Sequence, residues 1–135
     1  MRRSTVTLLI LAAFLLNLAG CGDPRQAKIV PVDGKISFAD GKPLPKGTRL
    51  IFNPAEGNMG TATGETDESG MFKVVHNSGR NGAGVGKYTV QIMAPEGQGA
   101  EFYKVVSRAY FDNGGLLAVE VKEGMESLKL AVKKQ

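Results

Sequence analysis

Several residue types that build catalytic and metal centres are scarce in this sequence. Its 135 residues include one cysteine, one histidine and no tryptophan. A single cysteine excludes an internal disulfide framework and a multi-cysteine zinc site, and a single histidine excludes a histidine-rich metal centre. A chain of this length is sufficient for one domain and too short for two ordinary ones. These shortages disfavour most enzyme classes.

A long hydrophobic run is also lacking. The longest apolar stretch, residues 6–16, is interrupted only by Thr7 and is little more than half of the roughly 20 residues that a membrane-spanning helix needs. It follows Arg2 and Arg3, and a short apolar run behind a positively charged start is typical of a secretory signal peptide. The sequence therefore predicts that the protein is exported.

No strong excess of one charge remains once this segment is set aside. Residues 1–20 hold two of the 17 basic residues and none of the 13 acidic ones, so without them the formal charge falls from +4 to +2. Lys42, Lys46 and Arg49 are spread over a segment interrupted by prolines, which is typical of a solvated face. We expect no nucleic-acid partner, and anionic lipid headgroups are a secondary candidate for these basic residues.

The most specific motif lies directly after the apolar run. Residues 18–21 read Leu-Ala-Gly-Cys and resemble the lipobox of bacterial lipoproteins. The resemblance implies that the signal peptide, residues 1–20, is removed between Gly20 and Cys21, and that the thiol and the new amino group of Cys21 are acylated. Two or three acyl chains give a stable anchor, whereas one chain would be marginal. The alternative is a plain signal peptide that leaves Cys21 free.

A short polar segment, residues 21–27, would then tether the domain to the membrane and could span at most about 20 Å. The resemblance predicts a membrane-anchored lipoprotein of the cell envelope. Gly22, rather than an aspartate, follows the cysteine directly, and this slightly favours the outer membrane over the inner one.

From residue 28 onward, apolar residues recur at every second position, and no stretch of helical length is amphipathic. This alternation is typical of antiparallel strands with one buried face. It predicts six strands and a weaker seventh, residues 62–66, that would suit a sheet edge. Residues 28–134 are therefore expected to form an all-β domain, a seven-stranded antiparallel two-sheet sandwich, with its last two strands paired as a hairpin across Glu123 and Gly124. The six clearer strands lie within residues 30–38, 49–53, 71–74, 87–92, 117–122 and 128–133.

Three residues are predicted to have specific structural roles in this sandwich. Gly34 would allow two chains to approach closely, and Gly70 would adopt a positive φ in the hairpin turn at residues 68–70. Asp67 would accept hydrogen bonds from the amides of that turn.

Three strings resemble carboxypeptidase-regulatory-like, or transthyretin-like, domains. They are VDGKISFADGKPLPKGTRLIFNP at residues 32–54, TDESGMFKV at 66–74 and GKYTVQI at 86–92. The resemblance covers about residues 28–134 and implies a prealbumin-like, Ig-like sandwich without known catalysis. Together with the lipobox, it makes the chain similar to small lipoproteins of planctomycete-type bacteria.

One long connection, residues 94–115, does not show the alternation. It contains Phe102, Tyr103, Tyr110 and Phe111, which are four of the eight aromatic residues after Cys21. Long connections in compact domains are usually functional or mobile. These aromatic side chains would either close one end of the sandwich or form an exposed interaction loop.

No pattern of catalytic residues is present. His76 lacks an activated serine or cysteine in a nucleophile-elbow string, so it is expected to be a surface or loop-stabilising residue. Asp67, Glu68 and Ser69 lack the further acidic ligands of a calcium loop, so we expect no metal and no cofactor. The expected function is a non-catalytic binding or structural module that contacts an envelope protein or a cell-wall polymer. The alternatives are an accessory subunit of an envelope enzyme or transport complex, or a carbohydrate- or small-molecule-binding protein.

Overall fold

The computed structural model describes residues 27–111 and 117–135. The predicted signal peptide, the predicted cleavage site at Gly20 and Cys21, and all but the last residue of the 21–27 tether lie outside these residues. The described chain consists mainly of strands, as the period-two pattern predicts. They are β1 (Ile29–Val30), β2 (Asp33–Phe38), β3 (Arg49–Pro54), β4 (Ala62–Thr66), β5 (Met71–His76), β6 (Ala83–Gly84), β7 (Gly86–Met93), β8 (Leu117–Val121) and β9 (Leu128–Val132). The all-β class is confirmed.

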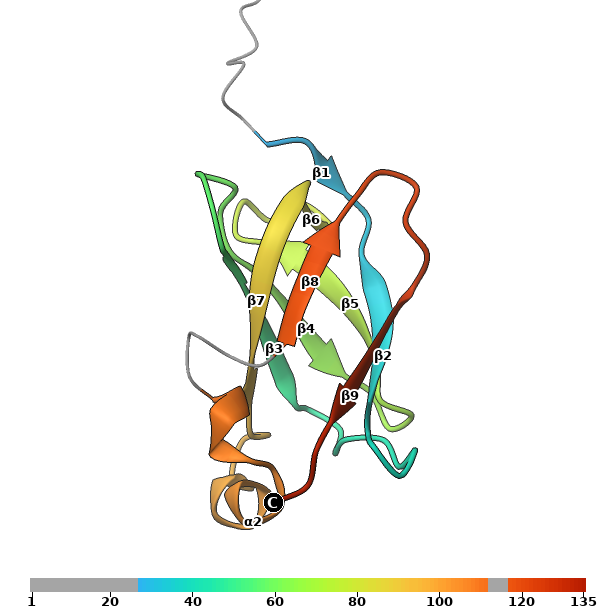
Figure 1. Cartoon of the computed structure of the whole chain (residues 1–135), viewed down its shortest axis with the longest axis vertical. Coiled ribbons are helices and arrows are strands. Elements are labelled where there is room, and N and C mark those ends of the chain that lie inside the picture. The colour runs from blue at the N-terminus through green and yellow to red at the C-terminus, as the bar shows by residue number, and fades with distance from the viewer. Residues whose placement is uncertain (1–26, 112–116) are drawn as a thin grey trace, which may run out of the picture.

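Seven of these strands form one hydrogen-bonded sheet in the order β8-β7-β3-β4-β5-β2-β9, and β1 pairs with β6 in a separate small sheet. The large sheet curls strongly. Figure 1 shows β7 and β8 in front of β4 and β5, so that the two halves face each other across the core. The described chain thus resembles a nearly closed barrel as much as two separate sheets.

Two predicted features of strand pairing are wrong. Strands β8 and β9 are not hairpin partners, because they lie at opposite ends of the sheet order. Strand β9 instead pairs in parallel with β2, so the sheet is not entirely antiparallel. The connection at residues 122–127 crosses between the two ends of the curled sheet, and Gly34 allows the backbone of Leu128 to approach β2 closely: a Cβ atom on this glycine would lie 2.6 Å from the Leu128 carbonyl oxygen.

The weak strand at residues 62–66 lies in the middle of the sheet rather than at an edge. Strand β4 pairs with β3 on one side and with β5 on the other. Its inward positions are small because neighbouring aromatic rings fill the space: a Cβ atom on Gly64 would lie 3.3 Å from the ring of Phe72. Bulk supplied by β5 thus explains why β4 has a weak hydrophobic pattern.

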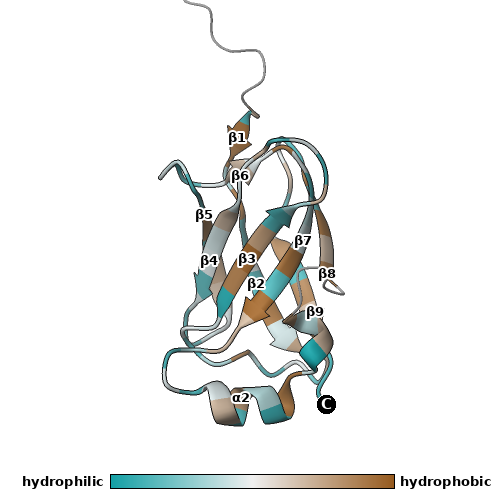
Figure 2. Cartoon of the chain, turned by 90° about the vertical axis from the view of Figure 1, so that its left-hand side faces the viewer, coloured by the Kyte–Doolittle hydropathy of each residue, from teal (hydrophilic) through white to brown (hydrophobic). Residues whose placement is uncertain are grey.

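The core lies between the two halves of the sheet. Phe52 on β3 is fully buried, with its ring centroid 6.3 Å from that of Phe72 and 6.2 Å from that of Tyr88. Figure 2 shows apolar and polar positions alternating along β7, as expected for a strand with one buried face. The Tyr88 hydroxyl is buried with this cluster and donates a hydrogen bond to the Gly84 carbonyl at 2.9 Å.

The connection after β7 contains helical structure that the sequence pattern did not predict. Helix α2 (Gly99–Val105) is followed by a 3₁₀ turn, η2 (Arg108–Tyr110). A seven-residue helix is only about two turns long, which is too short for a recognisable apolar period. Figure 1 places α2 and the C-terminus at the end of the domain opposite β1.

Candidate functional site

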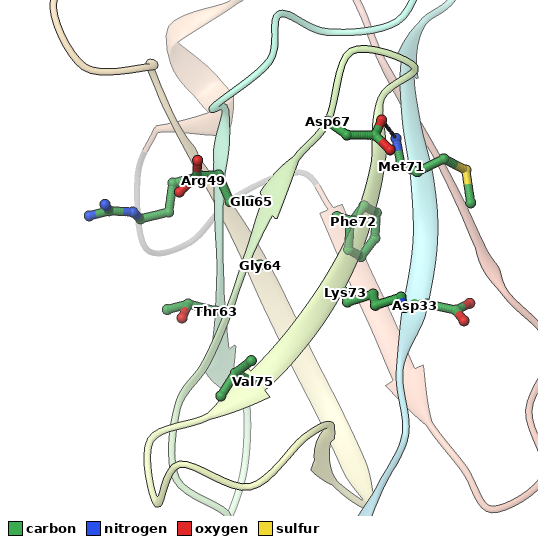
Figure 3. Close-up of a pocket in the computed structure, with 10 residues that line it drawn as sticks. All are labelled: Asp33, Arg49, Thr63, Gly64, Glu65, Asp67, Met71, Phe72, Lys73 and Val75. Atoms are coloured by element: carbon green, nitrogen blue, oxygen red, sulfur yellow. Dashed lines mark hydrogen bonds between the residues drawn. The ribbon is translucent and has the colours of Figure 1, made fainter.

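A groove with a volume of about 670 Å³ lies on the outward face of β2, β3, β4 and β5. Figure 3 shows its side chains along neighbouring strands, and we call it the outer groove. Its lining residues are Asp33, Arg49, Thr63, Gly64, Glu65, Asp67, Met71, Phe72, Lys73 and Val75.

Strand register brings four charged residues of this groove into one row. Arg49 on β3 is the direct partner of Glu65 on β4, and Glu65 is the direct partner of Lys73 on β5. Lys73 in turn lies opposite Asp33 on β2. We call Arg49, Glu65, Lys73 and Asp33 the charge row; along it the charge alternates in sign from one strand to the next.

The residues of the charge row make few contacts within the chain. Arg49, Glu65 and Lys73 are exposed and form no ion pair or side-chain hydrogen bond within residues 27–111 and 117–135. Asp33 accepts a hydrogen bond from the Ser127 hydroxyl at 2.6 Å. Opposite charges across neighbouring strands attract weakly when they remain hydrated, so most of the row is available for an external contact.

Apolar side chains flank the charge row. Met71 and Val75, on either side of Lys73 along β5, are 41% and 40% exposed. Beyond Arg49, a second groove of about 640 Å³ leads to the start of α2 and shares Arg49 and Glu65 with the first. The outward face therefore combines charges of both signs with exposed apolar groups, which is a composition suited to binding another surface.

A tight turn closes one end of the outer groove, with the roles that the sequence predicts. Asp67 Oδ1 accepts hydrogen bonds from the Ser69 hydroxyl at 2.7 Å and from the backbone amides of Ser69 and Met71 at 2.8 and 3.0 Å. These hydrogen bonds, that of the Ser69 hydroxyl first, lower the pKa of Asp67 below its ordinary value. Gly70 has a φ of 80°, so the positive φ is confirmed.

Buried threonines hold the chain next to this turn. The Thr48 and Thr66 hydroxyls both donate to the Pro45 carbonyl, at 2.6 and 2.8 Å, and the Thr48 amide donates to Thr66 Oγ1 at 3.0 Å. Both threonines are buried. This network fixes the start of β3 against the end of β4, which positions Arg49 and Glu65 on rigid backbone.

His76 connects two loops at the β1 end of the domain. Its Nδ1 atom accepts a hydrogen bond from the Ser78 amide at 3.1 Å and lies 2.7 Å from the Ser78 hydroxyl. Its Nε2 atom lies 2.7 Å from the Met59 carbonyl oxygen, so Nε2 carries the proton and donates to that carbonyl. Because both ring nitrogens are used in holding residues 59–78 together, the loop-stabilising role is confirmed.

The four aromatic residues of the long connection lie in different environments. Phe102 and Tyr110 are buried, Phe111 is half-buried, and Tyr103 is 39% exposed. Phe111 contacts Tyr103, with ring centroids 4.4 Å apart, and the Tyr110 hydroxyl accepts a hydrogen bond from the Lys133 amide at 3.1 Å. Most of this cluster packs against the end of the sheet, and only Tyr103 has substantial exposure to solvent.

The other candidate groups do not form a centre. Of the three basic residues, Lys46 and Arg49 both line the second groove; Lys46 Nζ lies 3.4 Å from Glu68, and the Lys42 backbone amide donates to Asp40. Within the described ranges, no group of three His, Cys, Asp or Glu residues could hold a metal ion. In the same part of the chain, no helix has the length and apolar character needed to cross a bilayer.

The charge row could not be recognised from the sequence. Along the chain Arg49 is close to Lys42 and Lys46, whereas Glu65, its partner on β4, is 16 residues away. The available signal was that each of the four strands carries at least one charged residue at an outward position, and β2 carries two, Asp33 and Lys35, but their alignment depends on the strand order.

Comparison of the chain with protein-family models, curated proteins and solved structures gives no match. The resemblance to transthyretin-like domains and to lipoproteins therefore stays a prediction.

Proposed function

We propose that this chain is an exported lipoprotein, anchored in the cell envelope through Cys21, with a non-catalytic β domain that acts as a binding or structural module. The observation that carries the proposal is the Leu-Ala-Gly-Cys string at residues 18–21, directly behind a positively charged start and a short apolar run. The only cysteine of the sequence occupies the position that lipidation requires.

The arrangement of the domain supports this assignment. The described chain enters at β1, and α2 lies at the opposite end (Figure 1). A tether before β1 would therefore leave the α2 end farthest from the bilayer and the outward faces of the strands directed sideways. A rigid sheet with grooves of both charge signs and exposed apolar groups is a scaffold for contact with an envelope protein or a cell-wall polymer.

The only histidine of the sequence is held in loop contacts. Both nitrogens of His76 are engaged, with Ser78 and with the Met59 carbonyl, which supports a stabilising role for this residue. The all-β character of the described chain and its filled core also support a sandwich-like module.

Replacement of the cysteine tests the anchor. We expect Cys21→Ser to abolish labelling of the chain by a radioactive fatty acid and to move the protein out of the membrane fraction, because serine lacks the thiol that accepts the lipid. Gly22→Ala, one residue along, keeps the thiol and is expected to remain labelled. Unchanged membrane association and labelling of Cys21→Ser would refute the proposal.

A further inference from the structure

The charge row has a symmetry that bears on what can bind it. Its order from β3 to β2 is Arg49, Glu65, Lys73 and Asp33, which is positive, negative, positive and negative. Rotating a second copy by 180° about an axis parallel to the strands, midway between β4 and β5, reverses this order. Glu65 then faces Lys73 of the partner subunit, and Arg49 faces Asp33 of the partner subunit.

Only one face-to-face arrangement achieves this match. A two-fold axis along the row keeps the order unchanged and places each charge over its own copy, where like charges repel. The alternating row therefore both favours one dimer and disfavours the other. A two-fold interface brings the same patch of each subunit together, so the patch must complement itself, and this one does.

The neighbouring row of side chains fits the same rotation. Thr63 on β4 is the direct partner of Val75 on β5, and both belong to the outer groove. The rotation that pairs the charges places the exposed Val75 side chain over Thr63 of the partner subunit, whose methyl group offers an apolar contact. Val75 thus faces a methyl group rather than a charge of the partner subunit.

We propose that the outward face of β2, β3, β4 and β5 binds a second copy of this chain, with a two-fold axis parallel to the strands and reciprocal contacts between Glu65 and Lys73. The proposal rests on the charge complementarity of the row, and it is independent of lipid attachment. An interface of four strands is small for a protein pair, so the dimer is weak and depends on concentration.

Charge exchange distinguishes contacts between copies from contacts within one copy. Lys73→Glu or Glu65→Lys alone places like charges opposite each other in the dimer. The double variant Glu65→Lys/Lys73→Glu restores every opposite-charge contact between copies. Within one copy, however, it places like charges beside Arg49 and beside Asp33, so a purely intrachain role would be damaged further and not restored.

The experiment uses the full-length chain in detergent micelles, with sedimentation velocity from about 10 µM to about 1 mM, the range in which weak complexes dissociate. We expect dimerisation that weakens at least about tenfold in each single variant and returns to within about threefold of the original in the double variant. A carbodiimide, which joins lysine to glutamate without a spacer, should link Lys73 to Glu65 between two copies of the original chain.

The matched control is an exposed charge pair outside this face. Lys104 and Glu101 on α2 form an ion pair at 2.8 Å, and Lys104→Glu is expected to leave dimerisation unchanged. Thermal unfolding of each variant verifies that it folds. A monomer throughout the concentration range, single variants that dimerise normally, or a double variant that is not restored would each overturn the proposal, whatever the outcome of the Cys21→Ser test.

Discussion

Along β2, β3, β4 and β5, the residues that point into the domain pack closely against one another, whereas most of the charged residues that point outward make no side-chain bonds within the described part of the chain. On the inner face, the Phe72 ring fills space left open by Gly34 and Gly64, where an added Cβ atom would lie 2.6 and 3.3 Å from its atoms. On the outer face, Arg49, Glu65 and Lys73 form no ion pair or side-chain hydrogen bond within the described residues. The inward residues of these strands therefore stabilise the fold, and the outward residues of the same strands remain available to bind another molecule.

The largest expected loss of stability follows removal of the Phe72 ring, which packs against the other inward residues. Phe72→Ala should lower the free energy of unfolding by about 3–5 kcal/mol, because it removes a buried aromatic side chain and leaves a cavity. Urea unfolding followed by far-UV circular dichroism measures this loss. Met71→Ala, the neighbouring outward position on the same strand, is the control and should cost far less. Equal losses in both variants would contradict the difference between the faces.

A smaller effect is expected at the inner glycine of β2. In Gly34→Ala, the new methyl group would lie 2.6 Å from the Leu128 carbonyl oxygen and 2.6 Å from the Phe72 ring, so β2 and β9 must move apart. Overpacking of this kind costs about 1–3 kcal/mol. Amide hydrogen exchange should show β9 losing protection before β4.

Gly99→Ala provides the control for that substitution. This glycine lies in α2, and an added Cβ atom would make only an ordinary contact, at 3.4 Å, with the Tyr103 side chain. We expect an unchanged or slightly higher stability, because alanine favours the helix. If Gly34→Ala were equally harmless, the close packing of β2 against β9 would not be a source of stability.

The strands could be predicted from the sequence because each buries one face, whereas their pairing could not. Alternation along residues 87–92 marks β7 clearly, but nothing local indicates that β9 pairs with β2 rather than with β8. The small inward residues of β4 suggest an edge strand, but they are small because Phe72 on the neighbouring β5 fills the space beside them. Helix α2 could not be predicted, because a helix of two turns is too short to show a period of apolar residues.

For the site as well, the sequence predicts features within one turn but not those that depend on strand pairing. The roles of Gly70 and Asp67 follow from residues within one turn, so the sequence was sufficient for both. The charge row depends on the order of four strands, and a pattern read along the chain cannot supply that order. Roles that depend on neighbouring residues in the chain could therefore be predicted, and an arrangement that depends on the pairing of distant strands could not.

The outer face should be nearly neutral for stability. Lys73→Ala and Glu65→Ala are each expected to change the free energy of unfolding by less than about 0.5 kcal/mol, because exposed charges without a close partner contribute little. Urea unfolding at low protein concentration measures this, since any dimer is then dissociated. A loss of several kcal/mol in either variant would mean that the row serves the fold and not recognition.

The smallest effect concerns Asp67, at the end of the outer groove, and it appears only in acid. Because the pKa of Asp67 is lower in the folded chain than its ordinary value of 3.8, its hydrogen bonds stabilise the fold fully above that value. This contribution is lost as the pH falls through the lowered pKa of the folded state. Asp67→Asn should therefore show a smaller fall in Tm than the original chain when the pH decreases below about 4.

Ser69→Ala removes the hydroxyl that lowers the pKa most, and NMR titration should then place the pKa of Asp67 closer to 3.8. A Tm that falls in parallel for Asp67→Asn and the original chain would show that the turn does not contribute to acid sensitivity.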